Sequence, residues 1–102
     1  MIKKIESKDN SIIKLCQRLS TKKYRDKEAL YLIEGPNLLE EAIKNGAEIK
    51  YILASEDFDI EAVSALEGCD IYLLGNRLFS KISLTETPQG VMAIVKKTEM
   101  PI

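Results

Sequence analysis

The sequence predicts an α/β fold, a three-layer α/β/α sandwich around a mainly parallel four-stranded sheet. Short apolar runs rich in β-branched and aromatic residues alternate along the chain with segments whose apolar residues recur at helical spacing. Strands that alternate with helices are typical of parallel sheets covered by helices on both faces. The 102 residues suit one domain, and 45% hydrophobic with 30% charged residues is an ordinary globular composition.

The first helix is expected over residues 11–20. Asn10 is a candidate N-cap, and apolar side chains then recur on one helical face. Lys14 and Arg18 lie nearly opposite that face, because successive helical residues are about 100° apart. The basic segment 22–27 continues this row if the helix runs on, and forms a basic loop if it does not.

The central element is a strand over residues 30–33 followed directly by a helix. Four consecutive apolar residues suit a strand buried on both faces. Pro36 fits the first helical position because its missing N–H would be unpaired there anyway. Apolar residues then recur at helical spacing until Gly46, which favours the end of the helix.

Five further elements complete the predicted order. The strands are runs of β-forming residues, and the helices begin at small or polar residues and carry apolar residues at helical spacing. They are a strand over 48–54, a helix over 59–68, a strand over 70–74, a helix that starts at 75–76, and a strand over 90–95.

Positive charge is concentrated at the start of the chain. Residues 1–30 hold nine basic and four acidic residues, a net charge of +5, so the rest carries −6 if the whole chain is −1. Such asymmetry favours a polyanion-binding end on an acidic domain, although a solvated basic surface is the simpler interpretation. The candidate phosphate-binding residues are Lys14, Arg18, Lys22, Lys23 and Arg25.

Several classes of chemistry find no support in the sequence. There is no histidine and no Cys-x-x-Cys, so a zinc site or a histidine-based triad is not expected, and Cys16 and Cys69 are interpreted as reduced, buried hydrophobes. Nucleotide-binding and nucleophile-elbow fingerprints are missing. Apolar runs fall short of the ~18 residues of a spanning helix, and the start lacks a signal-peptide core. A cytoplasmic protein without membrane contact is therefore expected.

Two turns carry the remaining site candidates. Glu34 and Gly35 end the central strand, where open α/β sheets often keep their sites, although Glu34 also suits a simple helix-capping role. Gln89 lies in the polar loop 85–90, which enters the last strand. Its amide suits hydrogen bonding to a base edge or a phosphate, and a loop-rigidifying role is an equal alternative.

These residues together resemble the substrate-binding N-terminal domain of the SpoU/TrmH RNA methyltransferases. The resemblance covers nearly the whole chain in order and spacing, with Ser11 where the family usually has proline. It rests on Asn10-x-x-x-Lys14, Lys23-x-Arg25, Tyr31-Leu32-Ile33-Glu34-Gly35, Glu41-Ala42 and Thr85-x-Thr87-Pro88-Gln89-Gly90.

The resemblance implies a fold related to ribosomal proteins that bind kinked RNA, and a role in recognising ribosomal or transfer RNA. It implies an RNA substrate-binding domain over 1–98 and the start of a linker over 99–102. In the family a further, knotted domain binds S-adenosylmethionine, methylates a ribose 2′-hydroxyl and pairs two subunits. This chain alone is therefore expected to hold no catalytic residue, cofactor or metal.

Three functional readings remain at this point. The first is RNA recognition for an attached methyltransferase, in which the basic residues, Glu34, Gly35 and Gln89 contact RNA, most of all ribosomal RNA. The second is a free-standing RNA-binding protein, and the third is a docking or dimerisation module. A structural alternative for the site is a salt bridge between Arg25 and Glu34.

Overall fold

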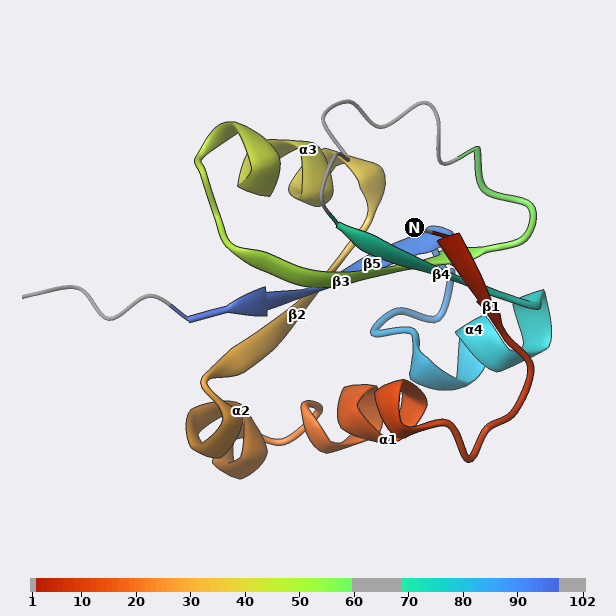
Figure 1. The fold of residues 1–102 in the computed structure, drawn as a ribbon, viewed down its shortest axis with the longest axis horizontal. Coiled ribbons are helices and arrows are strands. Elements are labelled where there is room, and N and C mark those ends of the chain that lie inside the picture. The colour runs from red at the N-terminus through yellow and green to blue at the C-terminus, as the bar shows by residue number, and fades with distance from the viewer. Residues whose placement is uncertain (1, 60–68, 98–102) are drawn as a thin grey trace, which may run out of the picture.

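The computed structural model describes residues 2–59 and 69–97, and over these residues the chain forms five strands and four helices (Figure 1). They are, in chain order, β1 (Ile2–Ile5), α1 (Ser11–Arg18), α2 (Lys22–Glu28), β2 (Leu30–Glu34), α3 (Pro36–Lys44), β3 (Ile49–Ser55), β4 (Asp70–Leu74), α4 (Asn76–Ile82) and β5 (Val91–Lys96). The helix expected over 59–68 falls outside the described residues, apart from its first position.

The described strands form one sheet in the order β1-β4-β3-β5-β2. The β1–β4 and β3–β4 pairs are parallel, whereas β5 is antiparallel to both β3 and β2. The α/β fold is confirmed, but the sheet is mixed rather than mainly parallel, and five strands rather than four are described. Four strands point the same way, and β5 is inserted among them in the opposite direction.

β5 runs antiparallel to its neighbours because the chain returns to the sheet soon after the short helix α4. α4 has seven residues and is thus about 10 Å long. The loop that follows is held at the carboxyl end of β2, and Gly90 accepts a backbone hydrogen bond from Ser55 at the carboxyl end of β3. The chain therefore enters the sheet from the carboxyl edge of its neighbours and has to run against them.

The structure also differs from the sequence prediction in two segments. β1 was missed because three of its four residues are exposed and only Ile5 is buried, so it has little strand pattern of its own. The segment after α1 is a second helix, α2, rather than a basic loop. α1 ends before Ser20 because the Ser20 and Thr21 hydroxyls donate to the carbonyls of Gln17 and Arg18.

Helices cover both faces of the sheet, which confirms the three layers. α1, α2 and α4 lie on one face and α3 on the other (Figure 1). Ile13, Leu19 and Phe79 pack against the first face, and Leu39 of α3 packs against the second. Among the described residues no helix has the length and apolarity needed to cross a membrane.

Candidate nucleic-acid interface

The carboxylate of Glu34, at the end of β2, holds the loop that follows α4. Glu34 is only 8% exposed. Its Oε1 accepts a hydrogen bond from the backbone N–H of Leu84 at 2.6 Å, and its Oε2 accepts one from that of Gln89 at 3.0 Å. The Ser83 hydroxyl lies 2.9 and 2.7 Å from the two oxygens. Hydrogen bonds to a charged acceptor are strong, so the loop is fixed at both of its ends.

Glu34 neither caps α3 nor pairs with Arg25. The N-cap of α3 is Gly35, and no side chain caps that helix. Arg25 lies in α2, before β2 begins, and its Nη1 donates to the carbonyl of Leu19 at 3.0 Å. Arg25 and Glu34 are therefore separated by the length of β2, about 13 Å at the usual rise per residue. The capping role and the Arg25–Glu34 salt bridge are therefore wrong.

Two glycines allow the turn and the loop to meet. Gly35 has a φ of 107° and donates its N–H to the carbonyl of Val91 at 2.9 Å. Gly90 has a φ of 86°, and a Cβ there would lie 3.1 Å from Cδ1 of Phe58. Residues with a side chain rarely adopt such φ values, and at Gly90 there is also little space for a Cβ.

Gln89 combines a fixed backbone with an exposed side chain. Its N–H is bound by Glu34, and its Nε2 donates to the carbonyl of Thr87 at 3.3 Å. The Thr85 hydroxyl donates to the same carbonyl at 2.7 Å. The backbone of Gln89 thus makes the loop rigid, while its amide group is presented to solvent.

α1 presents two cations on its outer side. Asn10 caps the helix by accepting the N–H of Ile12 at 2.8 Å, and Ile13 and Cys16 are buried against the sheet. Lys14 and Arg18 are exposed on the other side, as the periodicity predicts. Neither forms an ion pair within the described part of the chain.

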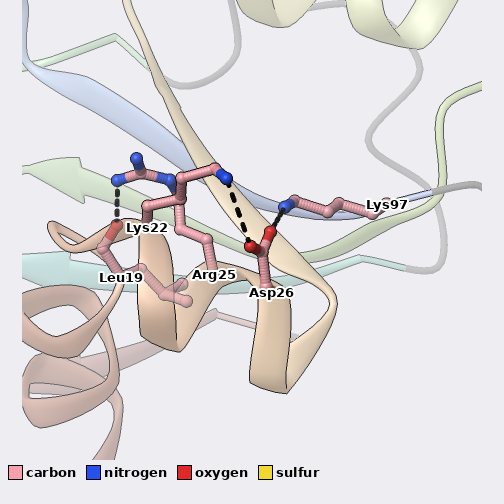
Figure 2. A network of polar contacts seen from close by, with 5 residues as sticks. All are labelled: Leu19, Lys22, Arg25, Asp26 and Lys97. Atoms are coloured by element: carbon pink, nitrogen blue, oxygen red, sulfur yellow. Dashed lines mark hydrogen bonds and ion pairs between the residues drawn. The ribbon is translucent and has the colours of Figure 1, made fainter.

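The cations of α2 differ in whether they already have a polar partner (Figure 2). The ammonium of Lys22 lies 3.8 Å from the Asp26 carboxylate, which Lys97 also contacts at 2.6 Å. The hydrogen bond from Lys97, with its charge, holds the pKa of Asp26 below its usual value. Lys23 is exposed and has no ion pair among the described residues, whereas Arg25 is half-buried and turned towards α1.

The predicted site residues form two groups rather than one. Glu34, Gly35 and Gln89 come together at the carboxyl end of β2. The five basic residues lie on α1 and α2, which precede the start of β2 on one face of the sheet (Figure 1). Arg25, from one group, precedes the start of β2, and Glu34, from the other, is the last residue of that strand.

Ser83 and the N–H of Leu84 were missed by the reasoning from sequence. They lie 49 and 50 residues from Glu34, so no local pattern links them. The available signal was general: a carboxylate at the end of a buried strand needs hydrogen-bond donors.

The Cys16 thiol is buried as expected and is not a reactive group of this site, whereas Cys69, also expected to be buried, is half-buried. Cys16 and Cys69 are both free, and burial raises the pKa of the Cys16 thiol to about 12. Over residues 2–59 and 69–97, no three His, Cys, Asp or Glu side chains gather closely enough to hold a metal ion.

Comparisons with known proteins agree with the fold described above. The chain is 40% identical over 99 residues to the 23S rRNA (guanosine(2553)-2'-O)-methyltransferase RlmP of Bacillus subtilis (strain 168), a match that covers 96% of this chain and 39% of that protein. The crystal structure of an rRNA methyltransferase from Sinorhizobium meliloti superposes with a TM-score of 0.82 at 27% identity, over 98% of this chain and 39% of the other.

A third relative is a putative RNA methyltransferase of the TrmH family from Porphyromonas gingivalis. Its structure matches with a TM-score of 0.74 at 27% identity, over 87% of this chain and 35% of its own. The chain thus spans well under half the length of these relatives. The resemblance to the substrate-binding domain of SpoU/TrmH methyltransferases is confirmed. Residues 10–93 match the family model for the MRM3-like substrate binding domain, and the chain belongs to that family.

Proposed function

We propose that this chain is the RNA-recognition domain of an enzyme that methylates a ribose 2′-hydroxyl of ribosomal RNA. The observation that carries the proposal is the exposed basic surface of α1, whose Lys14 and Arg18 have no ion pair among the described residues, in a chain of this family. The B. subtilis relative is named as a 23S rRNA 2'-O-methyltransferase, which supports ribosomal RNA as the substrate. Recognition would occupy residues 1–98, and residues 99–102 would begin a linker.

The basic residues of α1 and α2 would bind the phosphate backbone. Lys14, Arg18 and Lys23 are exposed and unpaired within the described residues, so they are free to replace counterions around RNA. Lys22 already forms an ion pair with Asp26, and Arg25 has free only those N–H groups that it does not donate to the carbonyl of Leu19. We therefore expect Lys14, Arg18 and Lys23 to account for most of the salt dependence of RNA binding.

The second group would read unpaired nucleotides. The exposed amide of Gln89 offers both a donor and an acceptor, which is what a base edge requires. Glu34 would act as a positioning residue, because its carboxylate is enclosed by the loop rather than open to a ligand. The φ of 107° at Gly35 favours glycine in this turn, and the Gly35 backbone lies beside the side chain of Gln89.

Catalysis would reside elsewhere in the protein. We infer that S-adenosylmethionine binds a further domain, which would also form the homodimer, and that the protein works in the cytoplasm. The role of the present chain would be to hold the RNA so that the target ribose reaches that domain.

RNA binding of this chain, measured by fluorescence anisotropy at several salt concentrations, tests the proposal. The probe is a fragment of 23S rRNA. The variant Lys14→Gln/Arg18→Gln removes two phosphate contacts and should reduce the slope of log affinity against log salt by about 1.4–1.8. A matched control, Lys44→Gln/Lys50→Gln, removes two exposed cations from α3 and from the first half of β3 and should leave the slope near wild type.

The outcomes separate the competing functions. Salt-dependent binding that the α1 variant weakens and the control does not would support recognition. Equal slopes for wild type and both variants would refute it. A tight dimer without RNA binding would favour the docking module.

A further inference from the structure

A second basic surface lies in a groove at the carboxyl ends of β1 and β4, apart from the residues discussed above. The groove has a volume of about 470 Å³ and includes Gly75, where a side chain would meet nothing within 4 Å. Its charged lining residues are Lys4, Glu6, Lys8, Glu56, Arg77 and Lys81.

Lys4 bridges the two acidic residues of the groove, and four cations against two carboxylates give its lining a net charge of +2. Lys4 Nζ lies 3.2 Å from Glu56 and 3.7 Å from Glu6. The hydrogen bond that Lys4 donates to Glu56 raises the pKa of Lys4 above its usual value. The other three cations have no ion pair within residues 2–59 and 69–97 and give the groove an unbalanced positive charge. They are Lys8, Arg77 and Lys81.

These cations stand on fixed backbone. Arg77 and Lys81 are four residues apart in α4, so they share one helical face. Phe79 and Ile82 anchor that helix in the core, with exposed fractions of 1% and 5%. Lys8 sits in a tight turn in which Asn10 donates its N–H to the carbonyl of Ser7 at 3.2 Å. A ligand would therefore order side chains but would not need to order the elements that carry them.

We propose that this groove binds a second stretch of RNA phosphate backbone, beyond the one that contacts α1 and α2. The inference rests on the proposed function. α1 and α4 pack together on the same face of the sheet (Figure 1), so the helix that carries Lys14 lies beside the helix that carries Arg77 and Lys81. A structured RNA that binds along α1 would continue past the turn at Lys8 into the groove. Continuity with that interface favours RNA over an acidic protein partner.

The variant Arg77→Gln/Lys81→Gln tests the inference in the same anisotropy assay. The long probe is a structured hairpin from 23S rRNA, and the short probe is a hexanucleotide of single-stranded RNA. For the hairpin we expect the salt slope to fall by about 1.4–1.8. For the hexanucleotide, which has fewer phosphates than the hairpin, we expect a smaller change. Lys44→Gln/Lys50→Gln is again the control with two charges removed.

The readouts distinguish failure of this inference from failure of the proposed function. If the α1 variant lowers the hairpin slope and the α4 variant matches the control, the groove is not an RNA surface and recognition stands. If wild type shows no salt-dependent RNA binding, both proposals fall. Lys8→Gln, in a turn outside every helix, provides a second variant should the α4 variant unfold. It should lower the slope by about 0.7–0.9, and an unchanged slope would overturn the inference.

Discussion

Removal of the Glu34 carboxylate should release the loop that it holds. Glu34→Gln keeps the shape of the side chain but replaces one oxygen by an NH₂ group. That group would face an N–H donor, either that of Leu84 or that of Gln89, where the native oxygens lie at 2.6 and 3.0 Å. Glu34→Ala removes both acceptors at once and also the partner of the Ser83 hydroxyl.

The magnitude follows from the hydrogen bonds that are lost. A hydrogen bond to a charged group contributes about 1.5–3 kcal/mol when buried, but Leu84 and Gln89 are exposed, so water replaces part of each loss. We expect the free energy of unfolding to fall by about 1–2 kcal/mol in Glu34→Gln and by about 2–3 kcal/mol in Glu34→Ala. For a domain of this size each kcal/mol lowers Tm by about 4–8 °C, so Glu34→Ala should melt at least ~8 °C lower.

Thermal unfolding and amide hydrogen exchange measure the two consequences separately. In Glu34→Ala the N–H groups of both Leu84 and Gln89 should lose their protection, and in Glu34→Gln only one of the two should, whereas the amides of β5 keep theirs. Glu86→Gln removes a carboxylate from the same loop and serves as the matched control, with an expected change within about 0.5 kcal/mol. A Glu34→Ala variant with wild-type Tm and wild-type exchange would refute the assigned role.

Three further predictions concern other parts of the fold. Gly90→Ala should cost about 1–3 kcal/mol in urea unfolding, because the residue has a φ of 86° and the new Cβ would lie 3.1 Å from Phe58; a change near zero would contradict this. Asp26 has a pKa below its usual value because of Lys97, so its stabilising effect is present at neutral pH and disappears as pH falls through that lowered pKa. Asp26→Asn should therefore lower Tm at neutral pH, and the difference from wild type should shrink as the pH falls through that lowered pKa; an equal loss at every pH would rule out the ion pair as the cause. Burial raises the pKa of Cys16 to about 12, so iodoacetamide at mildly alkaline pH should modify this thiol only after unfolding in urea; rapid labelling of Cys16 itself in the native chain, distinguished from Cys69 by mass spectrometry of peptides, would oppose its burial.

The sequence by itself determined the kind of elements and the outer side of α1. Hydrophobic periodicity is a local property, so the central strand, α3 and the exposure of Lys14 and Arg18 could all be predicted from neighbouring residues. β1 could not, because a short edge strand with one buried residue is stabilised by its pairing with β4 rather than by its own pattern.

Only the tertiary structure decided the direction of β5 and the partners of Glu34. Both depend on the same contacts, in which the carboxylate binds a loop 49 to 55 residues further along the chain. The sequence predicted Glu34 at the end of a strand and Gln89 in a loop. For Glu34, however, it suggested capping of the next helix or a salt bridge with Arg25, because these groups lie nearby in the chain. Hydrogen bonds to a buried carboxylate are chosen by the groups that folding brings within about 3 Å, whatever their separation in sequence.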